Sequence, residues 1–461
     1  MLGKVDMSEG ADVIATRTKF DLEQGIDPGP RPGSGLWRRL NANSLVRHNA
    51  LLLISGLSAS ALTFLFHPIV GHLLGSDQYG TVVSFGSLSM ILSLPAAIVP
   101  NLFNKFTADL VAHGRIDQVR YLLRRGTKYA IMFGVVAAVL FAVLGPSLAH
   151  AYKVPLLYVL LNSLGFVLAF AVPLSLGAVQ GRQQFAWFSL VNFLSAFLRV
   201  ALTAVALLLG WGLIGTFVAG FATGLIVYGL TFLPLRDIFR GPETRVPSLR
   251  PLLNYSLGAT LAFVAGTLLS NTDTTLAAPF LTHRDASYYD AVATMGRIVL
   301  FVAGSFVTVM FPKVATLHQQ GRPHGAVLAW TMAGVCTLSL CVIAVFAVAP
   351  DKIVGVIFQH QQAPPLAVTR LVVWYGVAML CLEGTSVLTG YFMALGRLSF
   401  VPIAFAAWAL EVVLFMHWHS TIAQMVTVTV ITMAAEFAAL AIFYAATRAF
   451  AARTPLAGGA A

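Results

Sequence analysis

Twelve long apolar stretches occupy the chain from about residue 50 to residue 447, and the polar gaps between them alternate between rich and poor in Lys and Arg. A helix needs about 20 apolar residues to cross the hydrocarbon of a bilayer, because backbone groups cannot bond to water there. The composition agrees, with 58% hydrophobic and only 10% charged residues, against roughly 25% charged residues in soluble domains. The sequence predicts an all-α polytopic membrane protein with about 12 transmembrane helices.

The predicted spans are 50–74, 80–103, 129–148, 155–179, 186–209, 213–232, 253–281, 288–311, 325–348, 367–392, 399–416 and 422–444. An even number of spans puts both termini on one side of the membrane. The even-numbered gaps and the two tails hold 23 of the 29 Lys and Arg residues, whereas the odd-numbered gaps hold only Lys153, Arg284 and Lys352. The positive-inside rule therefore predicts cytoplasmic termini, and the net charge of +11 reflects topology and not nucleic-acid binding.

The termini are expected to lie outside the bundle. Residues 1–47 form a predicted cytoplasmic tail, with disorder up to residue 35 and then a basic stretch, 36–47, that interleaves Leu and Trp with Arg. This stretch is either a short helix lying on an anionic leaflet or a solvated basic lead-in. Residues 451–461 form the second cytoplasmic tail. The first apolar run begins only near residue 50, so we expect no cleavable signal peptide.

The chain also contains traces of an internal repeat. Gly181-Arg182 after span four resembles Gly396-Arg397 after span ten, and His113-Gly114-Arg115 resembles Gln320-Gly321-Arg322. A third trace pairs 144–146 with 348–350. Three traces in the same order at similar offsets predict two lobes, 48–240 and 241–450, of six helices each. An even number of spans per lobe relates them by an axis along the membrane normal, around a central cavity.

These residues resemble the polysaccharide transporter and oligosaccharide flippase branch of the multidrug/oligosaccharidyl-lipid/polysaccharide exporter (MOP) superfamily. The marks are the turn at 73–80, which is similar to the family's Leu-Gly-x-x-x-Tyr-Gly, the Gly-Arg turns, and Asp273 followed by Tyr288-Tyr289. The resemblance covers roughly residues 45–450. It implies a MATE-like pair of six-helix lobes in the inner membrane of a bacterium that passes polyprenyl-diphosphate-linked sugars to the outer leaflet.

Charged residues inside the spans are costly, so each needs a partner or a wet lumen. The candidates are Arg199, Asp273, Arg297, Arg370, Glu383, Glu411 and Glu436. Asp273 and Arg297 lie about 12 and 13 Å from the outer ends of spans seven and eight, so the two side chains can meet. The pair is either a structural lock or a pair that opens when a diphosphate or a cation competes.

A flippase for an anionic lipid needs positive charge along its path. The predicted substrate cavity residues are Arg199, Arg297, Arg370, Asn271 and His67. Asn271 belongs to a polar run, 270–275, on a span that we expect to form a cavity wall, with part of the run facing water and part hydrogen-bonded to other helices. Lys105, Arg124 and Arg125 are candidate head-group contacts at the cytoplasmic mouth, although the positive-inside rule accounts for them without a ligand.

Four acids of the second half, Asp273, Glu383, Glu411 and Glu436, are candidates for ion coupling, with H⁺ or Na⁺ as the ion. Asp273 and Glu383 resemble the positions of the cation site in drug-exporting relatives. The alternative is that the acids bond to Ser, Thr or Arg and hold helices together. Span one carries His67 and His72 and no acid, which weakens a drug-exporter interpretation.

No other chemistry is indicated. The run His417-Trp418-His419 is more typical of an anchor at the membrane interface than of a metal site. The three cysteines, Cys336, Cys341 and Cys381, are expected to be packing residues. No catalytic cluster and no phosphate-binding glycine loop is present, so we predict a transporter and not an enzyme, without a cofactor or a bound metal. The expected partners are the lipid-linked oligosaccharide, membrane lipids, and a polymerase or glycosyltransferases. A cation-coupled exporter of drugs or metabolites is the alternative function.

Overall fold

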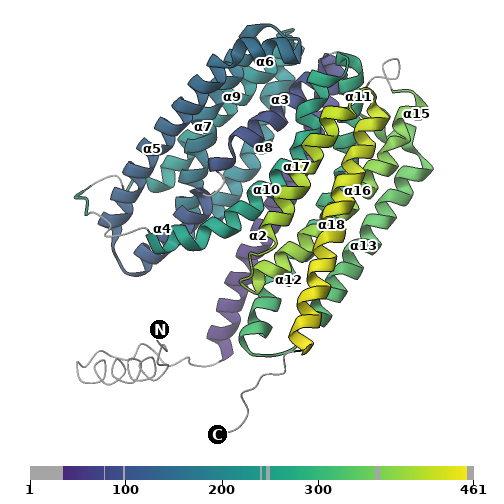
Figure 1. Ribbon diagram of the computed structural model, residues 1–461. Helices are drawn as coiled ribbons and strands as arrows, with labels where there is room; N and C mark the ends of the chain where they lie inside the picture. Colours follow the sequence, from purple (N-terminus) through teal and green to yellow (C-terminus); the bar gives the residue numbers. More distant parts are fainter. Residues whose placement is uncertain are drawn as a thin grey trace, which may run out of the picture. The chain divides into compact units, whose positions relative to one another are not determined.

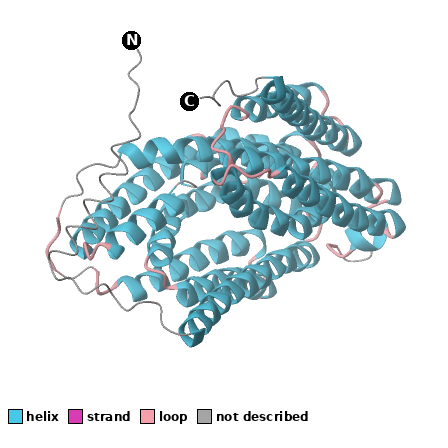
Figure 2. Ribbon diagram, turned by 90° about the horizontal axis from the view of Figure 1, so that it is seen from below, coloured by secondary structure: helices cyan, strands magenta, loops and turns pink. Residues whose placement is uncertain are grey.

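The computed structural model describes residues 35–76, 78–96, 99–238, 241–244, 250–358 and 364–453. This part of the chain consists of helices and short loops and contains no strand (Figure 1, Figure 2). The chain divides into two compact units, Met1–Leu53 and Ile54–Ala461. Residues 1–34 and 454–461, which hold most of the two predicted tails, lie outside the described residues.

The first helix, α2, runs without a break from Gly35 to Leu74. It therefore includes the basic stretch 36–47 as well as the first predicted span. The side chains of residues 35–53 lie outside the described part, so contact of this stretch with a leaflet stays a prediction.

Each predicted span has a helical counterpart. The helices of the N-terminal lobe, residues 54–238, after α2 are α3 (Tyr79–Leu92), η1 (Leu94–Ala96), α4 (Val99–Ala112), α5 (Ile116–Val143), α6 (Gly145–Tyr152), α7 (Leu156–Gly181), α8 (Phe185–Leu208), α9 (Gly212–Phe232) and η2 (Leu233–Leu235). Those of the C-terminal lobe, residues 250–453, are α10 (Arg250–Phe280), α11 (His283–Gly296), α12 (Ile298–Gln319), α13 (Gly325–Val348), α14 (Pro350–Gly355), α15 (Leu366–Thr369), α16 (Leu371–Ala394), α17 (Val401–His417) and α18 (Ile422–Arg453).

Eight helices in the described ranges are long and apolar enough to cross a membrane, and α3 and α17 are shorter apolar helices. Many large apolar side chains on these helices are exposed at the protein surface, such as Val143, Leu208 and Ile442. Exposed apolar side chains of this number suit contact with lipid and not with water. The protein is therefore a multi-pass membrane protein.

The second span of each lobe is interrupted. A 3-10 turn with Pro95 separates α3 from α4, and Arg297 separates α11 from α12. The outer pieces, α3 and α11, have 14 residues each. Discontinuous helices at matching places in two repeats often mark the binding region of a transporter.

The turns at the ends of α4 and α12 confirm one trace of the repeat. Gly114 and Gly321 have φ angles of 69° and 66°, the left-handed region that favours glycine. In both turns the next N–H bonds to the carbonyl five residues earlier, at 2.9 Å in each case.

The register of another trace is wrong by two residues. The left-handed residue after α7 is Gln183, and its counterpart after α16 is Gly396. Gly181 instead lies within α7, where a Cβ would be 2.5 Å from the carbonyl oxygen of Asn104 in α4. The glycine of the shared Gly-Arg pair therefore has a different structural role in each lobe: Gly181 allows close packing of α7 on α4, and Gly396 adopts the left-handed turn after α16.

The buried apolar residues form three clusters that differ between the two ends of the bundle. We call the end with the Lys/Arg-rich gaps the basic end, and the opposite end the Lys/Arg-poor end. One cluster contains residues of both lobes at the Lys/Arg-poor end, including Phe85, Tyr289 and Tyr375. The other two lie toward the basic end, and each belongs to one lobe, between residues 96 and 238 or between 310 and 440. The lobes thus share a core at one end and have separate cores at the other.

Candidate functional site

An ion pair between Asp273 of α10 and Arg297 lies at the break between α11 and α12. Arg297 Nη2 is 3.1 Å from Asp273 Oδ1 and donates to the backbone oxygen of Ser270 at 2.6 Å. The Asp273 side chain is fully buried, and that of Arg297 is 20% exposed. The predicted meeting of these two side chains is confirmed, whereas its role in transport stays a prediction.

Two tyrosine hydroxyls complete the hydrogen bonds of the Asp273 carboxylate. Tyr375 of α16 donates to Oδ2 at 2.6 Å, and Tyr289 of α11 donates to the same oxygen at 2.9 Å. The Tyr289 hydroxyl also lies 3.2 Å from Thr429 Oγ1 of α18. A buried charge requires such partners, because it has lost its hydration. Helices α10, α11 and α16 and the α11–α12 break therefore meet at one carboxylate, and α18 is linked to it through Tyr289.

At the break between α11 and α12, the ring of Tyr375 packs directly on the backbone of Gly296. A Cβ at Gly296 would lie 2.4 Å from Cδ1 of Tyr375, a distance that no side chain tolerates. Glycine therefore lets the Tyr375 ring reach Asp273 across the end of α11. The same approach positions Arg297, the next residue, beside the carboxylate.

The polar run 270–275 on α10 is packed between helices. Residues 271–275 are buried, and their side chains bond to protein groups. Trp408 Nε1 donates to Thr272 Oγ1 at 3.0 Å, and Thr274 Oγ1 donates to Ser87 Oγ at 2.7 Å. The expected hydrogen bonds from this run to other helices are present, whereas a cavity wall at this run stays a prediction.

Helix α3 of the N-terminal lobe meets α11 at the Lys/Arg-poor end (Figure 1). The backbone N–H of Gly80 donates to Ser287 Oγ at 2.7 Å. The Tyr79 hydroxyl lies 3.2 Å from Thr294 Oγ1 and 3.0 Å from His67 Nδ1 of α2. The predicted turn 73–80 therefore positions an interface between the lobes.

A second group of contacts joins α3 to α10 and α11. Ser84 Oγ lies 2.7 Å from the backbone oxygen of Thr274 and 3.3 Å from Asp290 Oδ2. Asp290 is fully buried, and its Oδ1 has no hydrogen-bond partner among the described residues. Asp290 was not among the predicted site residues, although the run Ser287-Tyr288-Tyr289-Asp290 carries enough polar groups to indicate a packed polar interface.

Helix α6 adds two bonds to backbone carbonyls of the C-terminal lobe. The Tyr152 hydroxyl donates to the oxygen of Thr275 at 3.0 Å, and Lys153 Nζ donates to that of Leu281 at 2.9 Å. All these contacts lie at the Lys/Arg-poor end, where the lobes share a core. Closure at this end therefore depends on many individually modest hydrogen bonds.

A family model described as "Polysaccharide biosynthesis protein" matches residues 110–364, which is more than half of the chain. The chain belongs to this family. The match covers α5 to α14 and so includes Asp273, Asp290 and Arg297. No curated protein matches the chain in sequence.

Solved structures show the fold of this member of the polysaccharide biosynthesis family. An inward-facing multidrug resistance MATE family transporter of the MOP superfamily has a TM-score of 0.69 at 12% identity, with 86% of this chain and 96% of that chain covered. An outward-facing structure of such a transporter has a TM-score of 0.60 at 10% identity, with 88% and 96% covered. The lipid II flippase MurJ in an inward closed conformation has a TM-score of 0.63 at 10% identity, with 86% and 87% covered. The predicted MATE-like, MOP-superfamily fold is confirmed.

Two of the predicted cavity residues lie close together. The Arg199 side chain on α8 is exposed, and its Cζ lies 4.7 Å from the ring centroid of Phe66 on α2. The next residue, His67, is linked through the Tyr79 hydroxyl to Thr294 of α11, three residues before Arg297. Helices α2, α8 and the α11–α12 break therefore bring two guanidinium groups near one imidazole.

The other predicted cavity residues lie elsewhere. Arg370 is exposed and lines a hollow of about 600 Å³ with Asp351 and Trp374, at the Lys/Arg-poor end of α13 to α16. Asn271 is buried and donates to the oxygen of Thr267 in its own helix at 2.9 Å. The structure does not bring these two together with Arg199, and their contact with a substrate stays a prediction.

The predicted coupling acids are all buried. Glu411 of α17 interacts electrostatically with Asp273, Glu436 and Arg297. Both of its carboxylate oxygens are without a hydrogen-bond partner among the described residues, as is one oxygen each of Glu383 and Glu436. Asp273, by contrast, is fully bonded. Buried polar atoms without partners are rare, and where they occur they often have a functional role.

The three predicted head-group contacts lie at the basic end and are exposed. Arg124 forms an ion pair with Glu243, and the Arg125 guanidinium lies 6.0 and 5.7 Å from the ring centroids of Tyr121 and Tyr129. Lys105 is on α4 at the same end. Their contact with a substrate stays a prediction.

Proposed function

We propose that this transporter moves polyprenyl-diphosphate-linked oligosaccharides from the cytoplasmic to the outer leaflet of a bacterial inner membrane by alternating access. Membership of the polysaccharide biosynthesis family supports a saccharide cargo. The positive-inside rule supports a cytoplasmic basic end with both termini on that side. The likeness in fold to a lipid II flippase, MurJ, also supports a lipid-linked cargo.

The observation that carries this proposal is the pair of guanidinium groups near His67. Arg199 has no ion-pair or hydrogen-bond partner within the described ranges, and Arg297 Nε is likewise without a bond there. A diphosphate crossing a bilayer needs counter-charge, and arginine offers planar donors that stay charged at every depth. Unused guanidinium donors at membrane depth therefore suit a phosphorylated cargo.

Alternating access is supported by the unequal ends of the bundle. The lobes share apolar residues and hydrogen bonds at the Lys/Arg-poor end and have separate cores at the basic end. A conformation of this kind is open to the cytoplasm when the basic end faces it. The higher TM-score to the inward-facing than to the outward-facing MATE structure agrees with this orientation.

Coupling to H⁺ or Na⁺ is the second part of the proposal. Glu411, Glu383 and Glu436 keep carboxylate oxygens without bonds, and Asp273 lies within electrostatic reach of Glu411. A cation or proton that binds these acids reduces the negative charge that attracts the Arg297 guanidinium. Release of the ion would then favour the Asp273–Arg297 pair, and binding would free the guanidinium for the substrate.

The test is flipping in proteoliposomes. A fluorescent polyprenyl-diphosphate-linked oligosaccharide is exposed to a membrane-impermeant quencher, and the protected fraction is followed with time. We expect Arg199→Gln to slow flipping at least tenfold, whereas Arg322→Gln, an exposed loop variant at the basic end, keeps the wild-type rate. A flipping rate of the wild-type protein equal to that of protein-free vesicles would contradict the proposal. Loss of a response to an imposed H⁺ or Na⁺ gradient in Asp273→Asn would support coupling.

The alternative function is a cation-coupled exporter of small molecules with the same fold, and the buried acids are the observation that favours it. Uptake of organic cations into the same vesicles, without flipping of the lipid-linked glycan, would decide for the exporter. A flippase of the proposed kind also requires glycosyltransferases that build its cargo and a polymerase that consumes it.

A further inference from the structure

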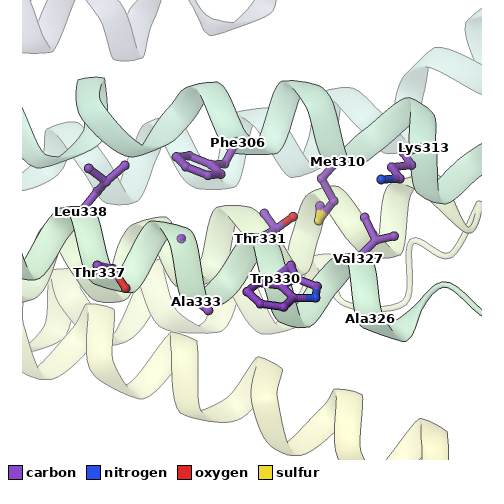
Figure 3. Close-up of a pocket in the computed structure, with 11 residues that line it drawn as sticks. Phe306, Met310, Lys313, Ala326, Val327, Trp330, Thr331, Ala333, Thr337 and Leu338 are labelled. Atoms are coloured by element: carbon purple, nitrogen blue, oxygen red, sulfur yellow. The ribbon is translucent and has the colours of Figure 1, made fainter.

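A groove of about 760 Å³ runs along the surface of the C-terminal lobe between α12 and α13 (Figure 3). Phe306 and Met310 of α12 form one wall, and Trp330 of α13 lies on the other. Lys313 lies at one end of the groove. The small, exposed residue Ala333 leaves space between the walls, and the Phe306 ring packs against Gly334, where a Cβ would lie 2.7 Å from Cε1.

The groove extends from the basic end to about the middle of the membrane. Lys313 lies six residues before the end of α12, or about 9 Å along the helix axis, and Trp330 lies about 8 Å after the start of α13. Leu338, at the other end of the groove, lies about 12 Å deeper than Trp330. One leaflet contributes about 15 Å of hydrocarbon, so the apolar length of the groove matches a single leaflet.

Trp330 and Lys313, at the end of the groove nearer the basic end, are residue types typical of the boundary between hydrocarbon and head groups. Trp330 is 79% exposed, and tryptophan is enriched where hydrocarbon meets the head groups. Lys313 is exposed and has no ion pair or hydrogen bond within the part of the chain that the structure describes. An ammonium at this depth complements a phosphate at the membrane surface.

We infer that this groove binds an anionic phospholipid of the leaflet at the basic end, with the phosphate on Lys313 and one acyl chain beside Trp330 and Phe306. The charge of Lys313 selects an anionic head group, and the apolar walls hold the chain. A phosphate on Lys313 is about 24 Å along α12 from Arg297, because 16 residues separate the two. The groove is therefore a lipid site separate from the proposed substrate path.

The experiment uses the tryptophan of the groove as the reporter. The full-length protein is reconstituted in phosphatidylcholine vesicles that contain a minor share of phosphatidylglycerol, with one of the two lipids brominated to quench fluorescence. The signal of Trp330 is isolated by subtracting the spectrum of Trp330→Phe. We expect about fivefold stronger relative binding of phosphatidylglycerol, which is the effect of one lysine near an anionic head group.

Two variants and a control make the test specific. Lys313→Gln should reduce the preference to about one, while Arg322→Gln, which removes an exposed charge at the same end outside the groove, should keep it. Ala333→Leu, at an exposed position in the groove, should lower quenching by both lipids.

Equal quenching by the two lipids, or a preference that survives Lys313→Gln, would overturn the inference. A polyprenyl phosphate that displaces phosphatidylglycerol from the groove would also overturn it, by assigning the site to a carrier lipid. None of these outcomes depends on whether the protein flips a glycan, so failure here is distinct from failure of the proposed function.

Discussion

The backbone N–H of Gly80 donates a 2.7 Å hydrogen bond to the side-chain oxygen of Ser287, so that a serine of the C-terminal lobe caps the first turn of α3. The first N–H groups of a helix have no partner within the helix. Here the partner lies 207 residues away in the sequence and in the other lobe. Opening of the lobes at the Lys/Arg-poor end must break this bond and expose the N–H to water.

Gly80→Ala should therefore shift the protein toward opening at the Lys/Arg-poor end. A Cβ at this position would lie 2.7 Å from the backbone nitrogen of Ser287, and a backbone atom cannot move aside as a flexible side chain can. The measurement is the spin-label distance between Leu156→Cys and Val348→Cys, two exposed sites on different lobes at this end, in a variant that lacks the three native cysteines. We expect a larger population at long distances.

Gly86→Ala is the matched control for this prediction. Gly86 lies in the same helix, and a Cβ there would meet no atom within 4 Å. Its distance distribution should equal that of the parent protein. An unchanged distribution in Gly80→Ala would show that the contact with Ser287 does not limit opening.

Removal of one partner of the Asp273–Arg297 pair should destabilise the protein strongly. Arg297→Gln leaves a buried carboxylate without its counter-charge, which costs about 3–5 kcal/mol in other buried pairs. The double variant Asp273→Asn/Arg297→Gln leaves no unpaired charge and should recover much of the unfolding free energy. Thermal unfolding of the single and double variants measures this coupling.

The same double variant separates the structural from the functional interpretation of the pair. If the pair only locks the helices, flipping recovers together with stability. The proposed function requires the Arg297 guanidinium itself, so a stable double variant should still flip at least tenfold more slowly than the wild type.

The arrangement of spans was predictable because it depends on properties that every residue carries. Each predicted span has a helix, since a bilayer demands an apolar length and satisfied backbone groups. The break at Arg297 was not predicted, because span eight, 288–311, was expected to be one continuous helix, and the end of α11 depends on contacts such as that of Gly296 with Tyr375. The repeat register was wrong at Gly181 because the left-handed residue after α7 is Gln183. A sequence predicts such a conformation at a glycine and not at a glutamine.

The candidate site was only partly predictable. Asp273 and Arg297 met as expected, because both lie at membrane depth on consecutive spans. Tyr375 is 102 residues from Asp273, and apolar context gave no sign that its hydroxyl binds a carboxylate. Asp290 lies only two residues inside the predicted span eight, next to the polar gap, so the sequence did not mark it as a charge at membrane depth; α11 begins at His283 and buries it. Long-range contacts decide these cases, and a single sequence does not contain them.

Tyr375→Phe should lower stability by about 1.5–3 kcal/mol, the range for a hydrogen bond to a charged group. The variant removes the 2.6 Å bond to Asp273 Oδ2 and keeps the ring that packs on Gly296. Tyr158→Phe, whose ring packs near Phe217, is a control with an expected change within about 0.5 kcal/mol. Equal melting temperatures of Tyr375→Phe and the wild type would contradict a bonded carboxylate.

Asp237 should make a small contribution to stability that depends on pH. Arg182 bonds both carboxylate oxygens at 2.8 Å and holds the pKa of Asp237, in the loop after η2, below its ordinary value. Because the pKa is lower in the folded than in the unfolded protein, the stabilisation is complete above about pH 4 and is lost as the pH falls through the folded pKa.

Asp237→Asn should therefore be less stable than the wild type at neutral pH and equal to it in strong acid. The difference should stay below about 1 kcal/mol, since the Asp237 side chain is 61% exposed and solvent screens the pair. Unfolding at the two pH values measures it, with Asp351→Asn, an exposed acid at the opposite end, as the control. A larger stability difference between Asp237→Asn and the wild type in acid than at neutral pH would contradict a lowered pKa of Asp237.

Asp290→Asn should strengthen closure of the lobes. A serine hydroxyl has one hydrogen, and Ser84 Oγ lies 2.7 Å from the oxygen of Thr274 but 3.3 Å from Asp290 Oδ2, so the shorter bond takes the hydrogen. An asparagine amide at position 290 supplies a hydrogen of its own to Ser84 Oγ, which joins the two lobes. The spin-label pair at Leu156 and Val348 should then report a larger closed population and flipping should slow, while Asp351→Asn leaves both unchanged. A shift toward longer distances in Asp290→Asn would mean that the carboxylate, and not a neutral group, holds α3 against α11.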